Sequence, residues 1–152
     1  MLRGARINVD YQPDPLPAIW MKFLFIASFG LVSAHHNQPI GVINEDPDLH
    51  DSARRLVLEI TAIAQGKGVA LPGNSTELIL QKATSFPYHT PTSLQLDVHS
   101  DKPCTELELF AGAVMDYGHR LGLSVVETTK IYQGTRNQLG RRGRRQGPHC
   151  RR

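Results

Sequence analysis

A near-continuous apolar run from Pro17 to Ala34 is the feature that most constrains the fold of this chain. It contains a single charged residue, Lys22. A helix that is apolar on nearly every face belongs at the centre of a helical domain, so we expect one long core helix here. The ammonium group of Lys22 must then reach water, find a partner, or lose its proton more readily because of burial. Lysines tuned in this way act as general acids and bases, which makes Lys22 a candidate catalytic residue.

The same run allows two interpretations that involve a membrane. Translation from Met21 would give a basic start, an apolar core and small residues at the end, the pattern of a secretory signal. The preceding residues, which include Asp10 and Asp14, make a poor leader. A bilayer span needs about 20 apolar residues. The run is shorter than that and carries a charge, so we expect no membrane association.

Helix start and stop signals recur along the rest of the chain. Asp14 followed by Pro15 is a preferred helix start. The pairs Asn74–Glu77 and Thr105–Glu108 resemble capping boxes. Beyond the first dozen residues no stretch alternates as a strand would. We therefore predict an all-α fold. The expected helices cover about residues 15–34, 75–84, 92–98, 106–120 and 125–139, together with one that is capped by Asp46 or Asp48 and runs to about Gly66. Ser124 is expected to cap the last helix, and Ile40–Ile43 to lead into a turn.

The basic charge of the chain is concentrated at its C-terminal end. The chain has 17 Lys and Arg against 14 Asp and Glu, a formal net charge of +3. Six of the arginines fall in residues 141–152, and without them the net charge is −3. We expect a helical domain over residues 14–139 and a basic, disordered tail over residues 140–152. A tail without aromatic residues offers no surface for base stacking, so nucleic-acid binding is not expected.

The sequence shows no pattern that is typical of a metal site or a phosphate-binding loop. Cys104 and Cys150 are the only cysteines, which excludes a disulfide framework and a zinc site and favours a reducing, cytoplasmic compartment. The adjacent His35 and His36 cannot share one helix face as metal ligands, so we interpret them as loop residues. The glycines at Gly66 and Gly68 follow a helix rather than a strand, and a phosphate-binding loop is not indicated.

Three segments form a more specific set. The first is Ala18–Phe23, which has a W-x-K pattern and is followed by Pro39–Ile43. The second is Glu59–Pro72. The third is Thr92–Asp97, which is followed by Thr105–Glu108 and then by Gly112, Gly118, Gly122 and Tyr132. In this order they resemble the C-terminal domain of the ketopantoate reductase (2-dehydropantoate 2-reductase) family, over about residues 15–137. The resemblance implies a multi-helix domain like the C-terminal domain of 6-phosphogluconate dehydrogenase, and a homodimer.

The resemblance also implies an activity and roles for four residues. Such enzymes reduce a 2-keto acid to a 2-hydroxy acid with NADPH, on the route to pantothenate. Lys22 would be the general acid that protonates the ketone oxygen. Glu106 would bind the substrate hydroxyl and orient the lysine, Ser93 would hold the substrate carboxylate, and Asp97 would support the cleft.

The chain departs from the family pattern in three respects. Family asparagines are replaced by Ile26, Gly30 and Ile40, which removes polar contacts to ketopantoate. One residue is inserted between Asp97 and Glu106. The Gly-rich turn of the family's dinucleotide-binding domain does not occur. We expect residues 1–13 to be the remnant of an interdomain linker, and the isolated chain to lack turnover. The alternative is a non-catalytic helical module for dimerisation or ligand binding, a pseudoenzyme.

Overall fold

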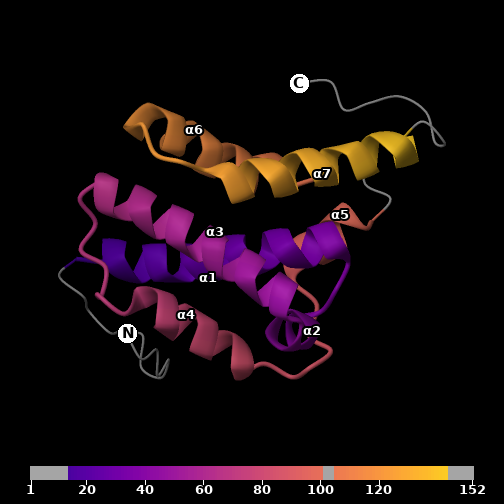
Figure 1. The fold of residues 1–152 in the computed structure, drawn as a ribbon, viewed down its shortest axis with the longest axis horizontal. Helices are drawn as coiled ribbons and strands as arrows, with labels where there is room; N and C mark the ends of the chain where they lie inside the picture. The colour runs from indigo at the N-terminus through magenta and orange to yellow at the C-terminus, as the bar shows by residue number, and fades with distance from the viewer. Residues whose placement is uncertain (1–13, 101–104, 144–152) are drawn as a thin grey trace, which may run out of the picture.

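The computed structural model describes residues 14–100 and 105–143, and in these residues it is helical without a β-strand (Figure 1). The all-α prediction is confirmed. Residues 1–13, both cysteines and the last nine residues lie outside the described part. The elements are α1 (Leu16–His36), α2 (Ile40–Glu45), α3 (Pro47–Gly66), α4 (Ser75–Thr84), α5 (Ser93–Val98), the π-helical η1 (Glu108–Gly112), α6 (Ala113–Leu121) and α7 (Val126–Gly143).

Helix α1 is the centre of the domain, as its composition predicts. It packs against α2, α3, α4, α5, α7 and η1. In Figure 1, α1 and α3 run side by side, with α6 and α7 on one side of the pair and α4 on the other. From Leu24 to Ala34 every residue of α1 is buried except Ile26, which is half-buried. Burial on all faces explains why this segment contains no charge after Lys22.

Helix α1 is longer than the sequence analysis anticipated. It has 21 residues, and by length and composition it could cross a membrane, so the expectation that it is too short was wrong. It is the one helix among the described residues that passes this test, which core helices of soluble proteins pass as well. It ends at His36, so His35 and His36 lie in its last turn rather than in a loop. Ile40–Ile43 also differs from expectation, because it belongs to α2.

The helix caps are partly those that the sequence indicates. The Asp46 carboxylate accepts hydrogen bonds from the backbone N–H groups of Asp48 (2.9 Å) and Leu49 (3.1 Å), so of the two predicted caps for α3, Asp46 and Asp48, it is Asp46 that acts. The Asn74 side chain makes no such bond at the start of α4. A capping box that the analysis missed joins Thr92 and Gln95 at the start of α5.

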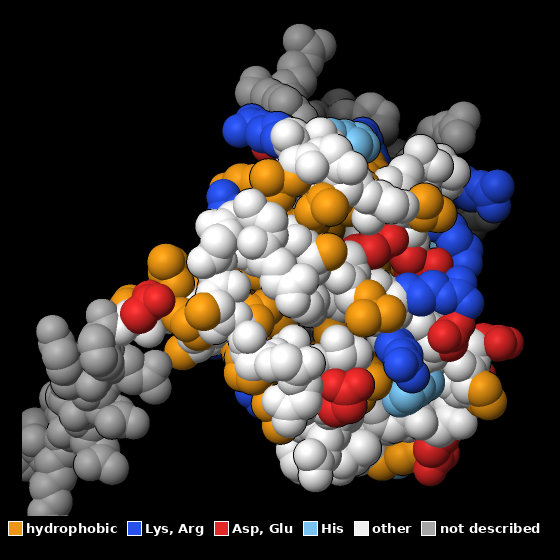
Figure 2. All heavy atoms as spheres, turned by 60° about the vertical axis from the view of Figure 1, so that its left-hand side comes forward, with side chains coloured by type: hydrophobic (Ala, Val, Ile, Leu, Met, Phe, Trp, Pro, Cys, Tyr) orange, Lys and Arg blue, Asp and Glu red, His pale blue; other side chains and the backbone are white. Residues whose placement is uncertain are grey.

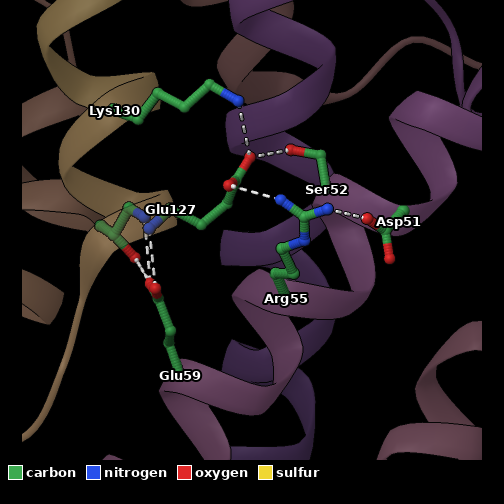
Figure 3. A network of polar contacts seen from close by, with 7 residues as sticks. Asp51, Ser52, Arg55, Glu59, Glu127 and Lys130 are labelled. Atoms are coloured by element: carbon green, nitrogen blue, oxygen red, sulfur yellow. Dashed lines mark hydrogen bonds and ion pairs between the residues drawn. The ribbon is translucent and has the colours of Figure 1, made fainter.

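The start of α7 is capped by a residue from another helix (Figure 3). The Glu59 carboxylate on α3 accepts hydrogen bonds from the backbone N–H groups of Glu127 (2.7 Å) and Thr128 (3.0 Å), and from the Thr128 hydroxyl (2.6 Å). Ser124 was predicted for this role. A carboxylate at a helix N-terminus also complements the helix dipole, so Glu59 fixes α7 against α3.

The neighbouring Glu127 is nearly buried and anchors α7 a second time. Its side chain is 6% exposed and accepts a hydrogen bond of 2.6 Å from Ser52. The guanidinium of Arg55 and the ammonium of Lys130 each lie 3.6 Å from its carboxylate oxygens (Figure 3). A buried carboxylate is tolerated because these partners replace the lost water.

Candidate functional site

Lys22 lies in the N-terminal half of α1 with its side chain exposed. Its position in an apolar run allows the ammonium to reach water, to find a partner or to be buried, and in the structure the side chain reaches water. It takes part in none of the ion pairs among the described residues. Its neighbours Met21 and Phe23 are partly buried and pack against the core. The lysine therefore extends from a well-packed helix with its charge available to a ligand.

An aromatic contact brings the segment of Glu106 to α1 beside this lysine. The Phe23 ring stacks on Phe110, with centroids 6.3 Å apart and an angle of 15° between the rings. Phe110 donates its backbone N–H to the carbonyl of Glu106 at 3.2 Å, so the two residues are one helical turn apart. Two of the candidate residues thus come from segments that are in contact. No hydrogen bond or ion pair joins Lys22 to Glu106 within the described residues.

Asp97 acts directly on the backbone of Glu106. Its Oδ2 atom accepts a hydrogen bond of 2.6 Å from the Glu106 N–H. The predicted Thr105–Glu108 capping box is not formed, since the Glu108 carboxylate instead accepts a hydrogen bond of 2.6 Å from the Tyr132 hydroxyl on α7. The Glu106 side chain is exposed. Asp97 therefore holds the chain at Glu106 and leaves its carboxylate open to solvent.

Ser93 is next to a residue that packs on α1 well beyond Lys22. It is the first residue of α5 and is exposed. Its neighbour Leu94 is buried over Gly30, where an added Cβ would lie 3.5 Å from the Leu94 Cβ. Gly30 is two turns beyond Lys22, about 12 Å along the helix axis. The structure therefore places Ser93 near the middle of α1 and Lys22 near its start.

Gln95 is a buried residue that the sequence analysis did not single out. Its Oε1 atom accepts a hydrogen bond from the Ser33 hydroxyl (2.9 Å), and its Nε2 donates to Asn37 (3.1 Å). Because Ser33 and Asn37 lie at the C-terminal end of α1, these bonds tie the first turn of α5, with Ser93, to that helix. The spacing of Thr92 and Gln95 is the sequence signal that could have revealed it.

The described residues also line an apolar pocket of about 430 Å³, open to solvent, at the end of the molecule where α1 begins. Figure 2 brings this end forward, and hydrophobic side chains reach the surface there. At the pocket, Tyr117 lies beneath the ammonium of Lys67, which is 4.1 Å from the ring centroid. No local sequence pattern indicates the pocket, because α1, α3 and the η1–α6 segment meet to form it. Its lining residues are Ile19, Trp20, Phe23, Ile60, Ile63, Leu109, Phe110, Ala113, Val114 and Tyr117.

The residues that the structure describes have neither a metal-binding cluster nor a dinucleotide-binding motif. No group of three or more His, Cys, Asp or Glu side chains there could hold a metal ion. A dinucleotide fold needs a β-strand followed by a Gly-rich turn and a helix. Residues 14–100 and 105–143 include no strand, so they do not fit NADPH in that manner.

A family model and curated relatives of this chain point to the same family. The model of the ketopantoate reductase PanE/ApbA C-terminal family matches residues 14–138. The 2-dehydropantoate 2-reductase of Pyrobaculum aerophilum is 29% identical over 123 residues, which are 80% of this chain and 42% of that protein. The enzyme of the same name from Mycobacterium tuberculosis H37Rv is 29% identical over 126 residues, 82% of this chain and 41% of that protein.

Solved structures agree on the fold. A PanE/ApbA family ketopantoate reductase from Ralstonia eutropha JMP134 has a TM-score of 0.76 and 22% identity, covering 86% of this chain and 43% of that one. A dimeric ketopantoate reductase from Staphylococcus aureus has a TM-score of 0.76 and 21% identity, covering 87% and 46%. The chain spans about two fifths of the length of these curated relatives. It belongs to the ketopantoate reductase PanE/ApbA C-terminal family.

Proposed function

We propose that this chain is the substrate-binding domain of an NADPH-dependent 2-keto acid reductase resembling 2-dehydropantoate 2-reductase. The observation that carries the proposal is the family match over residues 14–138. The geometry supports it, because an exposed lysine on α1 lies next to the Phe23–Phe110 contact that brings in the segment of Glu106.

In this proposal Lys22 is the general acid that gives a proton to the ketone oxygen of the substrate. Glu106 binds the substrate hydroxyl and orients the lysine. Ser93 holds the substrate carboxylate from the start of α5, and Asp97 is a positioning residue through its bond to the Glu106 N–H. A substrate would lie along the flank of α1 that these elements border.

We further propose that NADPH is bound by a domain other than this one. The described residues do not fit the cofactor, so the isolated chain is expected to bind a 2-keto acid without reducing it. We also propose a cytoplasmic homodimer. The dimeric Staphylococcus aureus reductase of the same fold supports the homodimer.

Two assays test the proposal. The isolated chain should show no NADPH-dependent reduction of 2-keto acids. A chimera should restore turnover when this chain is fused to the part of the Pyrobaculum aerophilum reductase that lies outside the matched region. In the chimera Lys22→Ala should lower kcat by about 10²- to 10⁴-fold, the usual contribution of a general acid. Lys82→Ala, at an exposed lysine of α4, is the matched control and should keep activity.

The outcomes separate the proposal from its alternative. A chimera that folds and binds a 2-keto acid but never reduces it would support the non-catalytic ligand-binding module. Equal activity of the Lys22→Ala and Lys82→Ala chimeras would contradict the role given to Lys22.

A further inference from the structure

We propose that Tyr132 on α7 is a positioning residue for Glu106 and acts through the carboxylate of Glu108. The inference rests on the proposed function, in which Glu106 binds the substrate hydroxyl, and it adds a residue to that site. Tyr132 belongs to the segments that carry the family resemblance, but the resemblance gives it no role. Three features support the assignment: the contacts of Tyr132, the type of helix at Glu108, and a glycine beside Glu108.

Tyr132 binds the second residue after Glu106. Its hydroxyl donates a hydrogen bond of 2.6 Å to Glu108 Oε1. The guanidinium of Arg136 donates to the Tyr132 hydroxyl at 3.0 Å and lies 3.6 Å from the Glu108 carboxylate. Burial raises the pKa of Tyr132, and the bond to Glu108 raises it further against the opposing effect of Arg136, so the phenol keeps its proton at neutral pH. The three side chains therefore join α7 to the start of η1.

Glu108 is the first residue of η1, the π-helical turn that follows Glu106. Such turns are rare, and they occur frequently at functional sites. If η1 relaxed to an α-helix, one residue would leave the turn, and the preceding residues would rotate by about 100° around the helix axis. That rotation would redirect the Glu106 side chain. The hydrogen bond from Tyr132 to the first residue of η1 opposes it.

A glycine lets the Glu108 carboxylate lie close to the helix. An added Cβ at Gly112 would lie 3.2 Å from Glu108 Oε2 and 3.9 Å from the Glu108 Cβ. The carboxylate is therefore folded over Gly112, while its other oxygen accepts the bond from Tyr132. Gly112, like Tyr132, belongs to the segments that resemble the family. The contact between Gly112 and Glu108 gives both residues a part in the same arrangement.

Glu106 is held from both sides along the chain. Asp97 accepts a hydrogen bond of 2.6 Å from its backbone N–H, and Glu108 fixes the following turn to α7. Leu107, between Glu106 and Glu108, is 2% exposed and anchors the segment in the core. The Glu106 side chain itself is exposed. Loss of the Tyr132 bond should therefore leave the domain folded and change the direction of the Glu106 carboxylate.

Two ligands that differ by one hydroxyl group isolate this effect. Calorimetry would measure the binding of ketopantoate and of 3,3-dimethyl-2-oxobutanoate to the chain. Glu106→Ala should weaken the binding of ketopantoate alone, because only this ligand has the hydroxyl that Glu106 binds. Tyr132→Phe should weaken ketopantoate binding about two- to tenfold, the range for one lost hydrogen bond, and leave the dimethyl acid unchanged. When Glu106→Ala is already present, Tyr132→Phe should have no further effect, since Tyr132 acts through Glu106.

Variants of Glu108 test the route between the two residues. Glu108→Gln keeps an acceptor oxygen for the Tyr132 hydroxyl and should keep most of the affinity for ketopantoate. Glu108→Ala should lose affinity for ketopantoate as Tyr132→Phe does. Tyr88→Phe is the matched control, because it removes a phenol hydroxyl that bonds the Glu45 carboxylate beside α2. It should change the affinity for neither ligand.

The contrary outcomes are distinct. The inference is overturned if Tyr132→Phe changes neither affinity, if it weakens both ligands equally, or if it still weakens ketopantoate binding when Glu106→Ala is present. In each of these cases the selective effect of Glu106→Ala would still support the proposed function. If Glu106→Ala does not distinguish the two ligands, or if neither ligand binds to the parent chain, the role given to Glu106 fails and the inference fails with it.

Discussion

The carboxylate of Asp97 accepts a hydrogen bond of 2.6 Å from the backbone N–H of Glu106, nine residues further along the chain. The family resemblance assigns both residues to the same site but does not show how they interact. The bond is made to the backbone, so it fixes the position of Glu106 without neutralising its side chain. This arrangement suits a positioning residue.

Asp97→Ala should loosen the chain at Glu106. The bond resembles an N-cap, whose loss costs about 1 kcal/mol, so the midpoint of urea unfolding should fall modestly. The Glu106 amide should exchange its hydrogen faster in NMR measurements. Asp97→Asn keeps an acceptor oxygen and should behave like the parent chain. Unchanged amide exchange in Asp97→Ala would show that the bond does not hold Glu106.

Glu59→Ala should destabilise the domain by removing the cap of α7. Two backbone N–H groups and the Thr128 hydroxyl would lose their acceptor in a part-buried place (Figure 3). The expected cost is about 1–3 kcal/mol in urea unfolding, the range for buried donors left unsatisfied. Glu77→Ala, at an exposed position of α4, is the control and should change the unfolding free energy little. Equal stabilities for the two variants would contradict the assignment.

Gly41→Ala should be strongly destabilising. A Cβ at this position would lie 2.5 Å from the backbone oxygen and 2.6 Å from the Cα of Tyr88, so the backbone itself must move. Overpacking of this kind costs about 1–3 kcal/mol. At Gly73 an added Cβ meets nothing within 4 Å, and Gly73→Ala should be neutral or slightly stabilising. A neutral Gly41→Ala in thermal unfolding would show that α2 and the Tyr88 loop separate easily.

Stability should fall as the pH drops below about 6.5, through the histidines at the end of α1. Burial lowers the pKa of His35, with further lowering by His36 and Lys130 against an opposing effect of Glu127. Burial also lowers the pKa of His36, helped by Lys130 and opposed by Asp46 and Glu127. Between the folded and unfolded pKa values the unfolded chain binds more protons, so acid favours unfolding.

The geometry at His35 supports this prediction. Thr135 donates its hydroxyl hydrogen to the carbonyl of Ile131 (2.8 Å), so the His35 Nδ1–H is the donor in its 3.1 Å bond to Thr135. The ring packs so closely on Gly134 that an added Cβ would lie 2.5 Å from it. The melting temperature of the double variant His35→Gln, His36→Gln should depend less on pH between 7.5 and 5 than that of the parent. An unchanged slope would contradict the prediction.

Local sequence patterns predicted much of the fold because each depends on residues that are close in the chain. The apolar run identified α1 as the core helix, and the alternative caps Asp46 and Asp48 indicated where α3 begins. Errors occurred where a local signal had to compete with a distant partner. Ser124 was a reasonable cap for α7, but Glu59 from α3 occupies that role. Thr105 and Glu108 had the spacing of a capping box, but Glu108 instead pairs with Tyr132.

The candidate site also combines features that the local sequence predicts with features that depend on distant segments. The sequence by itself determined the all-α class and a helix long enough to form the core around Lys22, because hydrophobic periodicity and composition are local properties. The resemblance of its motifs added the family and the set Lys22, Ser93, Asp97 and Glu106. Only the tertiary structure decided that Asp97 binds the Glu106 backbone, that the start of α5 with Ser93 packs near the middle of α1, and that an apolar pocket opens where α1 begins. These features depend on which side chains of separate helices meet when the core is packed, and no spacing along one segment specifies that.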